Sequence, residues 1–220
     1  MDTIEHHPND ELLASYSAGS LPLSQALCLS AHLEQCHICS RKLQRLNRLG
    51  STLLQNLEPA PASPALKARL LDQLDSLVDE ANQKPDEVGD PSVPRCLHQF
   101  VKNGYAQLNW KWISPHIHNV ELCRDDNGAR VELLKIKPGG SASTHTHLGD
   151  EYTVILEGSF SDEQGIYRKG DFLMRDGSDE HTPVATKDQV CICLAITEGP
   201  IQFTGLFSRL LNPLVRMSYA

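Results

Sequence analysis

The chain has 220 residues, of which 40% are hydrophobic, and it carries a formal net charge of −8. This length exceeds that of an average domain, and the longest apolar runs are too short to cross a bilayer, so we expect two soluble domains and no membrane segment. The N-terminus lacks the basic and apolar segments of an export signal, and the seven cysteines include close pairs rather than a disulfide framework, which predicts a reducing, cytoplasmic location.

The charge is concentrated in the first part of the chain. Residues 1–90 carry 7 basic and 13 acidic side chains. Because an acidic segment repels phosphate groups, this distribution disfavours direct binding to nucleic acid and favours a basic protein as the partner.

The first 81 residues predict four helices. Apolar residues recur at helical spacing from Leu12 to Tyr16 and from Leu23 to Leu33, and a third helix should run from near Cys36 past Leu49. The pair Ser63-Pro64 is typical of a helix start and predicts a fourth helix after it. Its apolar stripe, which we expect to pack on its own domain rather than on another protein, comprises Leu66, Leu70, Leu71, Leu74, Leu77 and Val78.

The composition then changes twice. Residues 82–94 are rich in polar residues, Pro and Gly, which is typical of a linker. After residue 95 the apolar period becomes two, in short segments without intervening helices, which predicts a closed β-barrel or jelly roll. The expected organisation is therefore a helical domain over residues 1–81, a linker over 82–94 and an all-β domain over 95–220.

A first metal site is predicted in the helical domain. In His32-x3-Cys36-x2-Cys39 the three side chains stand at positions i, i+4 and i+7, so they can share one face at a helix or a helix junction. The pair His6-His7 precedes the first helix and can supply a fourth ligand, which would complete a His2Cys2 set suited to structural zinc. The alternative is that the cysteines are small core residues and the histidines lie at the surface.

A second metal site is predicted in the all-β domain. The segment Gly139-x5-His145-x-His147-x3-Glu151-x6-Gly158 resembles the first cupin motif, including both glycines. Residues two apart on a strand point to the same side, so His145 and His147 should face the barrel interior together, with Glu151 beside them.

The second cupin motif is only partly matched. The segment Gly170-x5-Asp176-x-Ser178-x2-His181 has its spacing, with Asp in place of Pro and Ser in place of the second Gly, and it makes His181 the fourth ligand. A His3Glu set is compatible with zinc or another divalent metal. His116 and His118 are two apart but lack a nearby carboxylate at cupin spacing, so we interpret them as surface residues or as neighbours of the site.

Cys191 and Cys193 alternate along a predicted strand and face the same side. They are interpreted either as small core residues or as a redox pair close to the metal.

Taken together, the opening histidine pair, the His-Cys-Cys set and the cupin ligands resemble the ChrR family of zinc-binding anti-sigma factors over about residues 4 to 200. The resemblance implies that zinc is held by His7, His32, Cys36 and Cys39. It also implies that the helical domain sequesters an extracytoplasmic-function sigma factor, and that the cupin domain senses singlet oxygen or organic peroxide and triggers its release. The alternatives are a metal-dependent cupin enzyme of the dioxygenase kind and a metabolite-responsive regulator.

Overall fold

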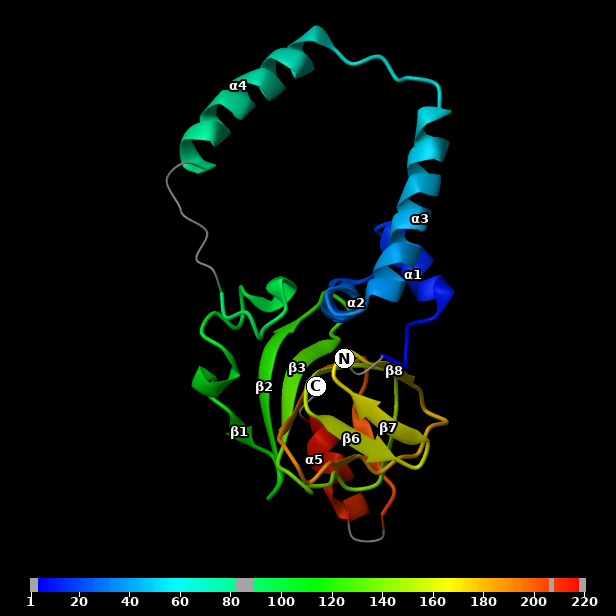
Figure 1. The fold of residues 1–220 in the computed structure, drawn as a ribbon, viewed down its shortest axis with the longest axis vertical. Helices are drawn as coiled ribbons and strands as arrows, with labels where there is room; N and C mark the ends of the chain where they lie inside the picture. The colour runs from blue at the N-terminus through cyan, green and yellow to red at the C-terminus, as the bar shows by residue number, and fades with distance from the viewer. Residues whose placement is uncertain (1–3, 82–88, 206–207, 218–220) are drawn as a thin grey trace.

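The computed structural model describes residues 4–81, 89–205 and 208–217 (Figure 1). Its first part is helical and comprises α1 (Asp10–Ser17), α2 (Leu23–Leu33), α3 (His37–Gln55) and α4 (Pro64–Ala81). Side chains cap several of these helices. The Leu12 N–H donates to the Asn9 carboxamide oxygen at 2.7 Å, and the Leu66 N–H donates to Ser63 Oγ at 3.2 Å, so Ser63 caps α4 as predicted.

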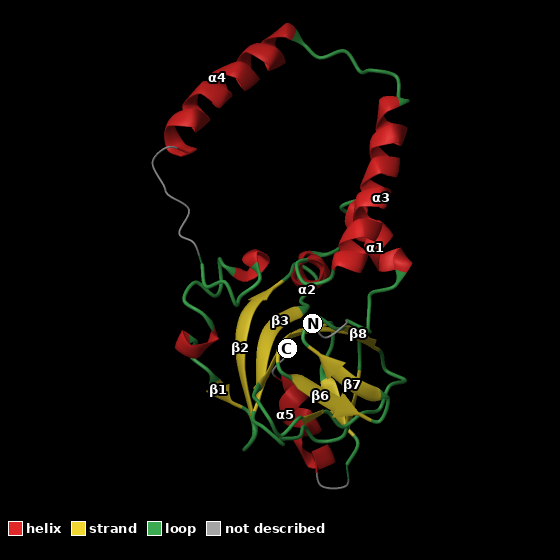
Figure 2. Ribbon diagram, in the orientation of Figure 1, coloured by secondary structure: helices red, strands yellow, loops and turns green. Residues whose placement is uncertain are grey.

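The second part is an all-β barrel, coloured yellow in Figure 2. Two short 3-10 helices, η1 (Arg95–Leu97) and η2 (Tyr105–Gln107), lead into it, and η3 (Ser208–Leu211) and α5 (Asn212–Met217) follow it. Its strands are β1 (Lys111–Trp112), β2 (Ile117–Arg124), β3 (Arg130–Ile136), β4 (His145–His147), β5 (Glu151–Glu157), β6 (Ser159–Asp162), β7 (Gly165–Arg168), β8 (Phe172–Arg175), β9 (Val184–Ala185), β10 (Cys191–Thr197) and β11 (Ile201–Phe203).

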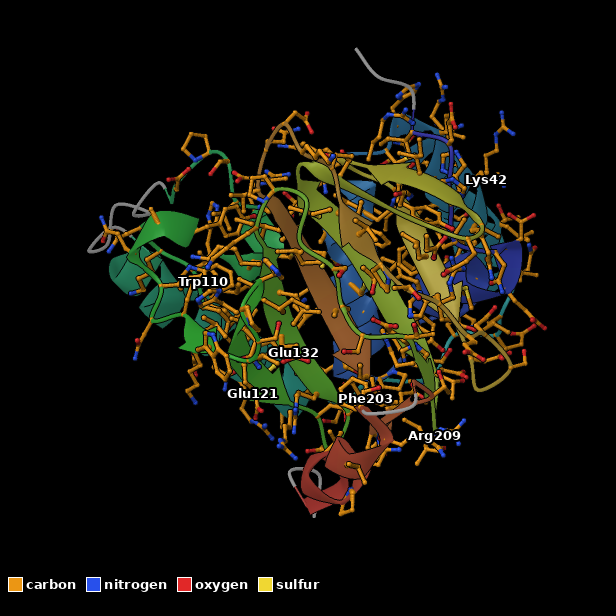
Figure 3. All side chains as sticks on the ribbon, turned by 90° about the horizontal axis from the view of Figure 1, so that it is seen from below. Lys42, Trp110, Glu121, Glu132, Phe203 and Arg209 are labelled. Carbon is orange, nitrogen blue, oxygen red and sulfur yellow. The ribbon has the colours of Figure 1, made fainter. Side chains whose placement is uncertain are left out.

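The strands pair antiparallel in three sheets. The largest has the order β1-β2-β3-β10-β5-β8, and the smaller two have the orders β11-β4 and β7-β6-β9. Figure 3 looks at the barrel from the side away from α1–α4, with Glu121 and Glu132 on the neighbouring strands β2 and β3. The fold class predicted from the sequence, helices followed by a cupin-like β domain, is confirmed.

The helices and the barrel share buried apolar side chains. Helix α2 lies against β5 and β10, and one continuous cluster contains Leu13 and Leu29 from the helices together with Leu133, Val154 and Leu194 from the barrel. All five are completely buried. Burying apolar area on both sides of this contact stabilises the docking of α2 on the sheet.

The prediction that the leucine stripe of α4 packs on its own domain is wrong for the side chains that the structure describes. Figure 1 shows α4 set apart from α3 and from the barrel. Its leucines are 40–56% exposed: Leu66, Leu70, Leu71 and Leu74. The side chains of Leu77 and Val78 lie outside the described part, as do residues 82–88 of the expected linker.

Helix α3 also extends beyond its packed portion. Its N-terminal half packs against α1 and α2, whereas four leucines near its C-terminal end are 58–69% exposed: Leu49, Leu53, Leu54 and Leu57. Isolated surface leucines are ordinary, but repeated exposed leucines on two consecutive helices indicate apolar faces that bind a partner. Within the described residues, no helix has the length and apolar character needed to cross a membrane.

Two candidate metal centres

The structure brings His7, His32, Cys36 and Cys39 together. One possible ligand atom from each of these residues lies within 4.8 Å of the others. His32 stands at the end of α2, Cys36 caps α3, and Cys39 lies in the first turn of α3, so the predicted shared face is formed at a helix junction. His7 reaches the cluster from the segment before α1, and its Nδ1 lies 3.4 Å from both sulfur atoms.

The chemistry of this cluster suits a tetrahedral cation. Zinc bonded to sulfur and nitrogen at its usual lengths places neighbouring ligand atoms about 3.3 to 3.8 Å apart, which includes the separations of His7 from the cysteines. His32 Nδ1 lies 2.7 Å from the carbonyl oxygen of Gly170. A carbonyl only accepts, so Nδ1 carries the proton and donates it, and Nε2 of the neutral ring keeps a free lone pair. That Nε2 is buried and has no hydrogen-bond partner among the described residues, as expected of a metal ligand.

Burial sets the ionisation of the same residues. Desolvation lowers the pKa of His32 to about 4, so its ring is neutral at physiological pH and available as a ligand. Burial, together with the neighbouring Cys36, raises the pKa of Cys39 to about 12. A bound cation would offset that penalty by stabilising the thiolate.

The structure also brings His145, His147, Glu151 and His181 together inside the barrel. His145 and His147 alternate on β4 and are both buried, and Glu151 begins β5. His181 is placed by two backbone hydrogen bonds with His145, of 3.2 and 3.1 Å. The altered second cupin motif therefore still delivers its histidine to the site.

Four side chains here converge on one point. Nε2 of His181 lies 3.1 Å from Nε2 of His145 and 3.2 Å from Nε2 of His147, and the latter lies 3.0 Å from Glu151 Oε2. His145 Nδ1 donates to the Ser143 carbonyl at 2.7 Å, so its Nε2 carries no proton in the neutral ring. Three imidazole nitrogens and one carboxylate oxygen that converge in this way form a ligand set that fits a divalent metal.

Burial again controls protonation. Desolvation lowers the pKa of His147 and of His181 to about 4 and lowers that of His145, whereas it raises the pKa of the Glu151 carboxyl. The imidazoles are therefore neutral at physiological pH, which is the form that binds metals.

An apolar cavity of about 70 Å³ adjoins the cupin cluster. His145, Glu151 and His181 contribute to its wall, and so does Cys193. The other residues that line it are Ile117, Leu134, Ile136, Ala142, Thr153, Phe160, Leu173, Arg175 and Pro183. The space accommodates only small molecules beside the metal ligands.

The remaining cysteine and histidine candidates lie around these clusters. Cys191 is completely buried among apolar side chains and Cys193 is 2% exposed. His6 is not in the helical cluster, since its ring lies against Tyr167 with centroids 4.7 Å apart. His116 and His118 belong to neither cluster.

Several contributors to the sites were missed from the sequence. Asp162 Oδ2 lies 3.4 Å from His181 Nδ1 and binds Arg175 at 3.1 Å, so it orients a ligand without being one. Gly170 plays the same part for His32. No spacing rule marks such residues, because they reach the ligands from distant strands and turns.

Comparisons with known proteins place the chain in a family. The family described as "ChrR Cupin-like domain" matches residues 100–202. The anti-sigma-E factor ChrR of Cereibacter sphaeroides is 32% identical over 216 residues, which cover 98% of this chain and all of the relative. The crystal structure of Rhodobacter sphaeroides SigE in complex with the anti-sigma ChrR matches with a TM-score of 0.78 and 32% identity, over 89% of this chain and all of that one. This chain therefore belongs to the ChrR family of anti-sigma factors.

Proposed function

We propose that this protein sequesters an extracytoplasmic-function sigma factor in the cytoplasm and releases it when its cupin domain meets an oxidant such as singlet oxygen or an organic peroxide. The related ChrR was crystallised in complex with SigE. The observation that carries the proposal is the pair of exposed leucine faces on α3 and α4.

These faces have the chemistry of a docking surface for helices. The leucines on α4 recur at spacings of three and four residues, so they form one stripe along the helix. Helix α3 presents a second leucine-rich end, and the extended segment 56–63 joins the two helices. Two amphipathic helices joined in this way can enclose a partner from both sides, with their apolar stripes in its grooves.

The helical metal site supports this role as a structural centre. Its four candidate ligands join the segment before α1, the end of α2 and the start of α3, and we propose that they hold Zn2+. All four tetrahedral positions are then filled by protein, which is typical of structural rather than catalytic zinc. The residues would fix the base of α3 and so the direction in which its leucines project.

The cupin site has the features of the sensing module. We propose Zn2+ or another divalent metal there, held by His145, His147, Glu151 and His181. The adjoining apolar cavity gives small oxidants a place to reside next to the imidazoles, which singlet oxygen attacks readily, and next to the thiol of Cys193. Oxidation of these groups would act on the helical domain through strands β5 and β10, on which α2 is docked.

Co-expression with a candidate sigma factor tests the proposal. We expect the two proteins to co-purify with two metal ions per copy of this chain, and we expect replacement of His32, Cys36 and Cys39 together to abolish co-purification. Retention of the sigma factor by that variant would contradict the proposed role of the helical site.

A cupin enzyme of the dioxygenase kind remains the second candidate, because a cavity adjoins the cluster and its metal would have an open position. Oxygen consumption by the full-length, metal-loaded protein, screened with phenolic and acidic substrates, separates the two functions. The regulatory function predicts no sustained turnover. A rate that scales with protein concentration and is lost in His147→Ala would favour the enzyme.

A further inference from the structure

The turn between β7 and β8 of the barrel, residues 168–172, reaches the helical metal cluster. The carbonyl of Gly170 accepts a hydrogen bond of 2.7 Å from Nδ1 of His32. The next residue but one, Phe172, lies against the same ring with centroids 5.6 Å apart. Groups of the barrel thus help to orient one candidate metal ligand of the helical domain.

A buried carboxylate in the same turn holds the segment that carries His7. Asp171 is 2% exposed, and its Oδ1 accepts the backbone N–H groups of Glu5 at 2.9 Å and His6 at 3.1 Å. Its Oδ2 accepts the N–H of Arg168 at 2.7 Å, which fixes the carboxylate in its own turn. The backbone N–H of Phe172 donates to the His6 carbonyl at 3.0 Å, so the segment before α1 is attached to the barrel at three points directly before His7.

Gly170 allows this close approach. Its φ is +93°, a region that favours glycine, and a Cβ at this position would lie 2.5 Å from Cδ1 of Ile4. A side chain here would displace the end of the Ile4 side chain and, because φ is positive, would strain the turn that presents the carbonyl to His32.

The other end of the same short strand borders the cupin cluster. Arg175 ends β8, pairs in register with Glu151, and binds Asp162 Oδ2 at 3.1 Å. The same oxygen lies 3.4 Å from Nδ1 of His181. Strand β8 therefore has groups that orient ligands of the helical cluster at its start and neighbours of the cupin ligands at its end.

We propose that the β7–β8 turn is a positioning element for the helical metal centre, in which Asp171 and the Gly170 carbonyl hold His7 and His32 in the orientation that binds the ion. Retention of the helical metal then depends on the docked barrel, and a shift of β8 that begins at the cupin ligands reaches the zinc ligands through this turn. The inference rests on the metal-binding part of the proposed function and names the route of its regulation. Groups that hydrogen-bond to metal ligands without contacting the metal contribute about 10- to 100-fold to the affinity for the metal.

Cobalt substitution in the full-length protein, without sigma factor, tests the inference. Of the two candidate clusters among the described residues, only the helical one includes cysteine ligands, so thiolate-to-cobalt absorption in the near ultraviolet reports that cluster. The rate at which this absorption disappears after addition of excess EDTA measures retention. We expect Asp171→Ala to accelerate the loss about 10-fold or more. Asp171→Asn, which keeps one acceptor oxygen, should give a rate between those of Asp171→Ala and the parent protein.

Ser24→Ala provides the matched control. Ser24 is completely buried in the first turn of α2, and its hydroxyl donates to Asp125 of the barrel. This substitution also removes a hydrogen bond between the helices and a barrel carboxylate, but about 12 Å from His32 along the helix axis. We expect it to change the rate less than twofold.

The outcomes separate the inference from the function on which it rests. Cobalt loss from Asp171→Ala or, where that variant does not fold, from Asp171→Asn at the parental rate would overturn the inference alone. Equal acceleration by Ser24→Ala would also overturn it, because general loosening of the interface would then be the cause. Absence of thiolate-to-cobalt absorption in the parent protein would overturn both the inference and the proposed helical metal site.

Discussion

Replacing Leu70 and Leu74 of α4 with alanine removes two large apolar side chains that lie one helical turn apart. In the free protein they are 52% and 56% exposed, so each has about half of its surface left to bury against a partner. Complete burial of a leucine side chain contributes about 1.5 to 3 kcal/mol, so the half that remains corresponds to about 1 kcal/mol for each residue. The pair should therefore weaken sigma binding by about 2 kcal/mol, or roughly 30-fold in Kd.

Biolayer interferometry with the purified sigma factor measures this change. Asp72→Ala on the opposite side of α4 is the control, and we expect it to leave Kd within about threefold. The melting temperature of the free protein should not fall in the leucine variant, because exposed side chains contribute little to the stability of the fold. An unchanged Kd, or a lowered melting temperature that accounts for weaker binding, would refute the assignment of the α4 stripe as a docking face.

Three further predictions concern the barrel. Leu133→Ala should lower the free energy of unfolding by about 2 to 5 kcal/mol, measured by urea denaturation, since Leu133 is completely buried in the shared apolar cluster. Glu132→Gln should raise the melting temperature at pH 8. Burial raises the pKa of this carboxyl, so its ionisation is harder in the folded protein than in the unfolded chain and destabilises the fold at high pH. The increase in melting temperature should therefore shrink as the pH falls through the raised pKa. An increase that does not depend on pH would refute the reasoning. His145→Ala combined with Glu151→Ala should leave sigma binding intact in a pull-down but abolish release by photosensitised singlet oxygen, and normal release would exclude the cupin cluster as the sensor.

Local patterns in the sequence predicted most of the fold. The helices from Leu12 to Leu49 follow an apolar period of 3.6, which depends only on neighbours along the chain. The central strands β5 and β10 depart from the expected period of two, because they are buried along nearly their whole length. The cap at Ser63 is equally local, because the hydroxyl and the N–H that it accepts are three residues apart. The spacing of His145 and His147 survives folding for the same reason.

The partner of an apolar face is not a local property. The apolar stripe of α4 shows that one side of the helix is suited to burial. The same stripe is expected whether that side packs on the helix's own domain or on another protein. The expectation of packing within the domain failed on this point. The different positions of His6 and His7 likewise depend on tertiary contacts, since the ring of His6 packs against Tyr167 whereas Nδ1 of His7 faces the sulfur atoms.

The residues that support the candidate ligands were beyond sequence reasoning. Asp171 lies more than 160 positions from the amides that it binds, and its role is fixed by the bend of a turn rather than by a motif. Asp162 is found beside His181 only after the strands of the barrel have paired.

The apolar cluster common to α2 and the barrel limits how such proteins can be recombined. A chimera that joins the first 81 residues of one relative to the barrel of another would pack the apolar side chains of α2 against a sheet with different side chains. The poor fit would leave voids or clashes where α2 docks. Helix α4, which lies apart from that cluster, is the segment that evolution or an engineer can exchange at little structural cost. Divergence in the choice of sigma factor should accordingly concentrate in α4 and the exposed end of α3, while α2 and the sheet beneath it change together.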